Sequence, residues 1–190
     1  GDADVIIAGG MESMTNSPYL IENARSGQRL GHGKLVDSMI HDGLWDVYND
    51  KHMGNCAEML AAERNFTRQL QDEYAIDSYN KSISAIKNKI FSTEIVPVEV
   101  NQRKGKSIFV MDDEEPGRIK FDKITKLRPA FASDGTITAA NASKLNDGAA
   151  VLLIMSKQKA NECGLKPLGS ILGHASSAHD PEWFTTAPSK

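Results

Sequence analysis

Uninterrupted apolar runs stand at two distant places in the chain, Val5 to Ala8 and Ala150 to Met155. A short run of this kind, rich in β-branched or aliphatic residues, is typical of a strand covered on both faces. The pattern therefore predicts two fully buried strands. Gly9 and Gly10 follow the first run, where they break the strand and let the backbone bend or approach another group closely.

Between these runs the apolar positions take the helical period. Cys56, Met59 and Leu60 recur at i, i+3 and i+4, which predicts a helix over residues 55–64. Thr67 is a suitable N-cap for a second, longer helix. The apolar face expected for that second helix consists of Ala75, Tyr79, Ile83, Ile86 and Ile90.

Shorter elements complete the pattern. Ser156 is expected to cap a short helix that ends at Gly164, a residue type suited to the position after a helix. Residues 11–50 show no clear period and predict a long excursion. Buried strands that alternate with helices favour an α/β core carrying an inserted α+β region. Further strands are predicted at residues 94–100, 107–111, 136–138 and 168–172.

Composition narrows the function classes. The chain has 190 residues, a net charge of −3 and a pI of about 6.0, so no basic excess points to nucleic acid or a membrane surface. Its longest apolar run, residues 149–155, is too short to cross a bilayer. Cys56 and Cys163 have no metal-ligand spacing and are read as reduced intracellular thiols. The opening Gly1 stands almost inside a strand, which suggests a truncated chain.

Residue types alone give weak chemistry. None of the five histidines stands beside a nucleophile motif, and no glycine pattern for a nucleotide phosphate is present. Residues 134–150 combine small side chains with two asparagines and two Asp-Gly steps. Small residues let a backbone approach a ligand, yet they also make tight loops, and composition favours the loop.

That same segment resembles a family signature. Thr-Ala-Ala-Asn-Ala-Ser at 138–143, followed by Leu-Asn-Asp-Gly-Ala-Ala at 145–150, is similar to the signature of the thiolase family. Ala8-Gly-Gly-Met-Glu-Ser-Met14, His52-Met-Gly54 with Ala57-Glu58, and Lys126-Leu-Arg-Pro-Ala-Phe131 agree with it in the expected order. The His-Met-Gly tripeptide favours the short-chain branch, the acetyl-CoA acetyltransferases.

The resemblance implies a partial five-layered α/β/α/β/α thiolase core with an inserted α+β loop domain. Residues 1–18 would belong to the N-terminal core and residues 19–132 to the loop domain that binds coenzyme A (CoA). Residues 133–156 would return to the N-terminal core, and residues 157–190 would open the C-terminal domain.

The implied reaction condenses two acetyl-CoA into acetoacetyl-CoA and CoA, or runs the reverse thiolysis, through a Cys acyl-enzyme. The family's catalytic Cys and His motifs do not occur in this sequence, so no catalytic residue is assigned. Cys56 and Cys163 match none of them. The chain alone is therefore expected to be inactive. A degradative 3-ketoacyl-CoA thiolase and a non-catalytic, thiolase-like CoA-binding fragment remain alternatives.

The resemblance also implies binding residues. Tyr79 resembles a position associated with potassium, completed by backbone oxygens near Ala139, Ala140 and Ala142. Tyr79 can equally be the core-facing aromatic residue of its helix. The expected CoA contacts are Leu44, His52, Met53, Arg118, Phe131, Ala139 and Ser143.

The remaining expectations concern partners and place. CoA enters as substrate, with acetyl-CoA and acetoacetyl-CoA, and no tightly bound cofactor is expected. The family implies a homodimer or homotetramer. A mitochondrial location is favoured, with the cytoplasm as the alternative, and neither nucleic acid nor a membrane is expected as a partner.

Overall fold

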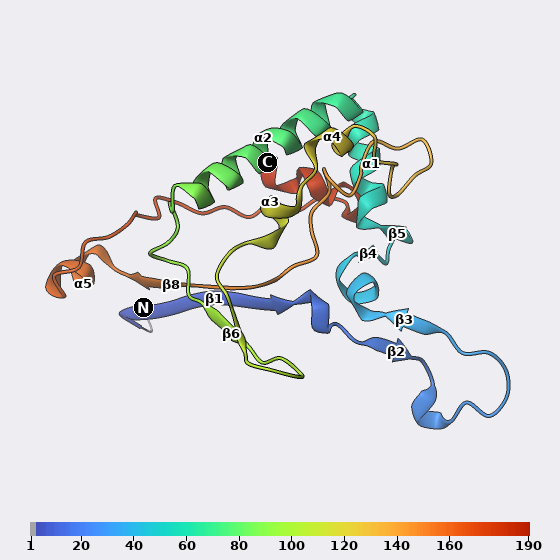
Figure 1. Ribbon diagram of the computed structural model, residues 1–190, viewed down its shortest axis with the longest axis horizontal. Helices are drawn as coiled ribbons and strands as arrows, with labels where there is room; N and C mark the ends of the chain where they lie inside the picture. Colours follow the sequence, from blue (N-terminus) through green and yellow to red (C-terminus); the bar gives the residue numbers. More distant parts are fainter. Residues whose placement is uncertain (1–2) are drawn as a thin grey trace. The chain divides into compact units, whose positions relative to one another are not determined.

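The computed structural model describes residues 3–190, so the first two residues of the predicted N-terminal core segment lie outside it (Figure 1). The chain forms two compact units. The first contains the described residues up to Cys56 together with Lys144–Lys190, and the second is Ala57–Ser143. The predicted division into core and loop-domain segments stays a prediction.

A long antiparallel ribbon dominates the first unit (Figure 1). Strand β1 (Val5–Ser13) pairs with β8 (Asp147–Met155) along its whole length. The two predicted strands are thus confirmed, but their burial is not: Ile7 is 75% exposed and Val151 is 72% exposed. Among residues 3–190 this sheet has only two strands, so its apolar side chains lack the covering layers that such runs ordinarily meet.

The glycine pair does not break β1. The strand continues through Gly9 and Gly10 to Ser13. A Cβ atom at Gly9 would overlap the carbonyl oxygen of Ala150 on the partner strand. Gly9 therefore allows a close approach between the two backbones, which is the second of the two roles expected for it.

Short hairpins fill the segment for which no period was found. β2 (Tyr19–Ile21) pairs with β3 (Leu35–Asp37), and β4 (Trp45–Asp46) pairs with β5 (Lys51–His52). Single turns at Met14–Asn16, Ala24–Ser26 and Met39–Gly43 connect them. Two or three residues per strand are too few to show an alternating pattern, which is why the sequence did not reveal them.

The C-terminal part of this unit has one correct and one wrong prediction. The Ser156 hydroxyl accepts a hydrogen bond from the Lys159 amide (3.1 Å) at the start of α5 (Lys157–Glu162), and Gly164 follows the helix at φ +65°. The strand predicted at 168–172 does not form, and Leu168 is fully exposed. An apolar run makes a strand only where another strand pairs with it. A 3₁₀ segment, Pro181–Ser189, closes the chain.

Two helices frame the second unit. α1 (Met53–Glu63) crosses the boundary from the first unit, and α2 (Arg68–Lys87) follows after a short turn. Ala75 and Tyr79 are buried as predicted, but Ile83 and Ile86 are exposed, and Ile90 lies beyond the helix end. The unit thus covers only the first half of the predicted apolar face.

Smaller elements complete this unit. β6 (Val98–Val100) pairs with β7 (Ile108–Val110), and α3 (Glu114–Arg118) and α4 (Phe121–Ile124) follow. The strand predicted at 136–138 is wrong: these residues form a loop whose amides bond to side chains. No helix among residues 3–190 is long and apolar enough to cross a membrane.

We expect Thr67→Ala to lower the free energy of unfolding by about 1 kcal/mol. The Thr67 hydroxyl accepts the Leu70 amide (3.2 Å) at the start of α2, and alanine leaves that donor without its partner. Ser82→Ala in the middle of α2 is the control, since its hydroxyl only donates back to the Ser78 carbonyl. Urea unfolding followed by circular dichroism measures both. Equal stability of both variants and wild type would contradict the capping role.

Candidate functional site

The hairpin β4–β5 carries the first group of expected contact residues and is shaped by Asp46. This carboxylate is only 3% exposed and accepts hydrogen bonds from the amide of Tyr48 (3.0 Å) and the side-chain amide of Asn49 (2.7 Å). The bond from the Asn49 side chain is the largest cause of a lowered Asp46 pKa. The closed turn brings Trp45 opposite His52 in the strand pair.

His52 is held in one orientation. The Gly54 amide donates to His52 Nδ1 (2.9 Å), and the Trp45 ring meets the imidazole edge-on with centroids 6.4 Å apart. Because Nδ1 accepts a hydrogen bond, the neutral imidazole carries its proton on Nε2. The Met53 amide donates to the Leu44 carbonyl (2.8 Å), so Leu44, His52 and Met53 form one part-buried group. This group places the imidazole beside apolar side chains in an orientation fixed by its neighbours.

The cysteines do not add a nucleophile to this group. Cys56 on α1 is fully buried, and loss of solvation, followed by the negative charge of Asp46, raises its thiol pKa. A thiol that ionises less readily attacks more slowly near neutral pH. Cys163 follows α5 and is exposed. The expectation that neither cysteine takes a catalytic role stays a prediction.

In the second unit, the carboxylate of Glu58 holds a loop onto α1. Its oxygens accept the amides of Thr136 (2.9 Å) and Ile137 (2.8 Å) and the hydroxyl of Thr136 (3.0 Å). A side chain at Gly135 would collide with this carboxylate. Glu58 thereby satisfies donors that a strand partner would otherwise have to satisfy.

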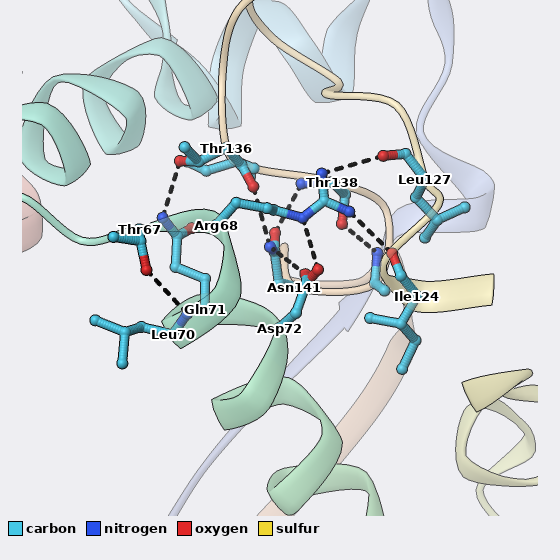
Figure 2. A network of polar contacts seen from close by, with 12 residues as sticks. Thr67, Arg68, Leu70, Gln71, Asp72, Ile124, Leu127, Thr136, Thr138 and Asn141 are labelled. Carbon is cyan, nitrogen blue, oxygen red and sulfur yellow. Dashed lines mark hydrogen bonds and ion pairs between the residues drawn. The ribbon is translucent and has the colours of Figure 1, made fainter. Parts of the chain in front are cut away.

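Asp72 on α2 holds the next part of the same loop (Figure 2). Its Oδ2 accepts Arg68 Nε (2.7 Å) and its Oδ1 accepts the side-chain amide of Asn141 (3.1 Å). Arg68 also donates to the carbonyls of Ile124 (2.9 Å) and Leu127 (3.1 Å). One ion pair therefore connects α2 with α4 and with the loop.

Asn141 connects the Asp72 carboxylate to the loop backbone. Its amide nitrogen also donates to the Thr136 carbonyl (3.1 Å), while its oxygen accepts the Thr138 amide (2.7 Å). Thr138 is fully buried and accepts the Ala140 amide at Oγ1 (3.2 Å) and the Ala142 amide at its carbonyl (2.9 Å). Side chains thus fix the path of the backbone from Thr136 to Ala142.

The other expected contact residues all lie in the second unit. Ala139 and Ser143 are exposed on the ordered loop, and Phe131 is half-buried earlier in the same loop. Arg118 is exposed at the end of α3 and pairs with Glu114 (2.9 Å). The structure thus brings Ala139 and Ser143 together on one turn and places Arg118 on a separate element.

Tyr79, expected at a potassium site, is buried on α2 and faces the core. Its hydroxyl donates to Glu115 (2.9 Å), and its ring meets Phe121 edge-on. Ala140 is buried and Ala142 half-buried on the ordered loop. Described His, Cys, Asp and Glu residues form no group of three that could hold a metal ion. Potassium binding by backbone oxygens stays a prediction.

Sequence reasoning missed the roles of Arg68, Asp72 and Asn141. A signal was present, because Asp72 precedes Ala75 by three positions and Tyr79 by seven. This spacing puts a carboxylate on the buried face of α2, where a charge needs a partner. Arg68, one turn earlier, is the natural candidate.

Comparisons with known proteins agree on one family. Residues 1–158 match the family described as "Thiolase, N-terminal domain". The chain belongs to the thiolase family. The relatives include acetyl-CoA acetyltransferase 2 of Arabidopsis thaliana, 50% identical over 99% of this chain and 47% of the relative, and the acetyl-CoA acetyltransferase of Schizosaccharomyces pombe, 48% identical over 100% and 48%.

Solved structures extend this result to the fold. The acetyl-CoA acetyltransferase of Syntrophomonas wolfei matches with a TM-score of 0.88 and 41% identity, over 97% of this chain and 46% of that one. The Bacillus anthracis acetyl-CoA acetyltransferase matches with a TM-score of 0.88 and 40% identity, over 95% and 46%. The predicted α/β thiolase fold is confirmed. This thiolase chain spans about half the length of the curated relatives it matches.

We expect Glu58→Gln to lower the free energy of unfolding by about 1–3 kcal/mol. The substitution turns one acceptor oxygen into an NH₂ group that faces the amides of Thr136 and Ile137. Glu63→Gln, an exposed position at the end of α1, is the matched control. Urea denaturation compares the two. The role of Glu58 would be refuted if both variants were as stable as wild type.

Stability should fall in acid partly through Asp46. Because the folded chain lowers the Asp46 pKa, the unfolded chain binds this proton more readily. The stabilisation is therefore complete above the unfolded pKa and is lost as the pH falls below about 4. Asp46→Asn should flatten this decline, whereas Asp4→Asn, at an exposed position, should not. Urea midpoints over a pH series give the slopes, and identical slopes in all three proteins would contradict the prediction.

Proposed function

We propose that this chain is part of a thiolase that uses acetyl-CoA, condensing two molecules to acetoacetyl-CoA and CoA or catalysing the reverse thiolysis. The observation that carries the proposal is the match of nearly the whole chain to relatives named acetyl-CoA acetyltransferase at 48–50% identity. The name states the activity of those relatives. For the complete enzyme to which this chain belongs, that activity is our hypothesis.

In this proposal the chain supplies binding rather than bond chemistry. A Cys thiolate attacks the thioester carbonyl, the carbon–sulfur bond to CoA breaks, and CoA leaves as a thiolate. The second acetyl-CoA loses an α-proton to the family's second Cys, and its carbanion attacks the carbonyl carbon of the acyl-enzyme, so that the enzyme sulfur leaves as a thiolate. The sequence contains none of the family's motifs for these steps. Catalysis is therefore assigned to residues other than those of this chain.

The binding roles follow the two ordered groups. His52 is assigned to line the acyl end of the CoA site, and Met53 limits the length of the acyl group. Ser143 offers a hydroxyl to the pantetheine amides, beside the small Ala139. Their fixed backbones support this assignment, because a contact held in place costs less ordering on binding. Leu44, Phe131 and Arg118 are assigned to the pantetheine arm and the adenine nucleotide.

The same proposal includes a potassium ion near Tyr79 and the oxygens of Ala139, Ala140 and Ala142, and assembly as a homodimer or homotetramer. The burial of Tyr79 and the ordered alanine backbone support a rigid ion site. A mitochondrial location, with the cytoplasm as alternative, rests on the resemblance alone.

We expect the purified chain to bind CoA and to show no thiolysis of acetoacetyl-CoA. Ser143→Ala should weaken binding roughly three- to tenfold, because one hydrogen bond is lost. Ser133→Ala, an exposed serine earlier in the loop, is the control. Isothermal titration calorimetry gives the affinities, and absorbance of acetoacetyl-CoA follows turnover.

The outcomes separate the alternatives. Absence of CoA binding would overturn the proposal for this chain. Equal affinity for acetoacetyl-CoA and a 3-ketoacyl-CoA with a longer acyl group would favour a degradative thiolase. A non-catalytic role would gain support if the natural protein carrying this sequence bound CoA without turnover.

A further inference from the structure

We infer that Asp72 is a positioning residue for CoA, one that sets the backbone path of the contact turn Ala139–Ser143 through Asn141. The inference rests on the proposed function, since it takes the exposed residues of this turn as CoA contacts. Asp72 itself does not line the surface, because only 3% of its side chain is exposed. Its effect on a ligand must therefore pass through other groups.

The ion pair to Arg68 fixes the carboxylate. A buried charge without a partner is strongly destabilising, so Asp72 requires Arg68. Arg68 cannot shift freely, because its two terminal nitrogens donate to the Ile124 and Leu127 carbonyls. With Oδ2 committed to this arginine, Oδ1 remains to accept from the loop. Figure 2 shows the loop side chain of Asn141 meeting the carboxylate on this side.

Asn141 converts this contact into a backbone conformation. Its NH₂ group uses one hydrogen on Asp72 and the other on the Thr136 carbonyl, which leaves only its oxygen facing the Thr138 amide. Because the Asp72 carboxylate can only accept, the Asn141 side-chain amide turns its NH₂ group toward Asp72 and its oxygen toward Thr138. Reversed, the amide would present a donor to the Thr138 donor.

Thr138 then orders the turn that carries the predicted contacts. It holds the amides of Ala140 and Ala142 with its hydroxyl and its carbonyl. Ala139 and Ser143 are the exposed residues of this turn. Small displacements of a contact group weaken binding of a correctly oriented ligand. The position of both contacts therefore depends on a carboxylate on α2 that never meets the ligand.

The key variant is Asp72→Asn, which conserves shape. Its oxygen can still accept from Arg68, but its NH₂ group would face the NH₂ group of Asn141. The double variant Asp72→Asn/Asn141→Asp restores a donor opposite an acceptor and keeps one carboxylate in the network. The carboxylate that it introduces at position 141 faces the Thr136 carbonyl, so rescue should be incomplete. Asp77→Asn, an exposed carboxylate paired with Lys81 on the same helix, is the matched control.

The experiment measures CoA affinity by calorimetry, amide hydrogen exchange at Ala140 and Ala142, and thermal unfolding, all on the full chain. For Asp72→Asn we expect about tenfold weaker CoA binding, the effect of losing one charge-assisted contact. Exchange at Ala140 and Ala142 should be faster even without CoA. The double variant should recover at least about threefold of that affinity, and Asp77→Asn should match wild type.

The outcomes distinguish this inference from the proposed function. Wild-type affinity in folded Asp72→Asn, or no rescue in the double variant, would overturn the positioning role and leave CoA binding intact. A wild-type chain that does not bind CoA would overturn both. If Asp72→Asn does not fold, Asn141→Ala replaces it, because it leaves the Arg68–Asp72 pair in place. Unchanged affinity in that variant would again refute the inference.

Discussion

The second unit depends on a buried ion pair. Asp72 and Arg68 lie one helical turn apart on α2, and together they bind the α4 carbonyl of Ile124 and the side chain of Asn141. A surface pair at this spacing adds little stability. Here the carboxylate is buried, so loss of either partner leaves an unsatisfied charge inside the protein. The pair stays fully hydrogen-bonded only while α4 and the loop remain packed against α2.

The loop from Thr136 to Ala142 shows why side chains take this role. It has no strand partner, yet Ile137, Thr138 and Ala140 are buried. Buried amides need acceptors, and Glu58, Asn141 and the Thr138 hydroxyl supply them. Small residues give the backbone room for this path, as Gly135 does beside Glu58. The small residues of this segment suggested either a tight loop or a ligand contact, and the structure allows both. The buried residues form a tight loop, and the exposed residues are the candidate contacts.

Local signals in the sequence predicted what local physics determines. Thr67 and Ser156 cap helices because each hydroxyl reaches an amide three residues later, with no help from distant parts of the chain. The motif residues Glu58 and Asn141 were recognised as part of a signature, but Glu58 bonds to Ile137, 79 positions away, and Asn141 bonds to Asp72, 69 positions away. No periodicity contains that information. The strand predicted at 136–138 failed for the same reason, since a side chain rather than a strand satisfies its amides.

Burial was the hardest property to predict, and the two units differ in it for a physical reason. β1 and β8 have the sequence of covered strands, yet Ile7 and Val151 are exposed on a ribbon of two strands. An apolar run indicates that a strand is stabilised when other parts of the protein cover its faces. It does not specify that the same chain supplies the cover. Asp72 is the opposite case: its residue type predicts exposure, and the arginine one turn earlier permits burial. Hydrophobicity alone therefore gives the wrong burial for Ile7 and Val151 in the first unit and for Asp72 in the second, whereas the neighbours of each side chain account for all three.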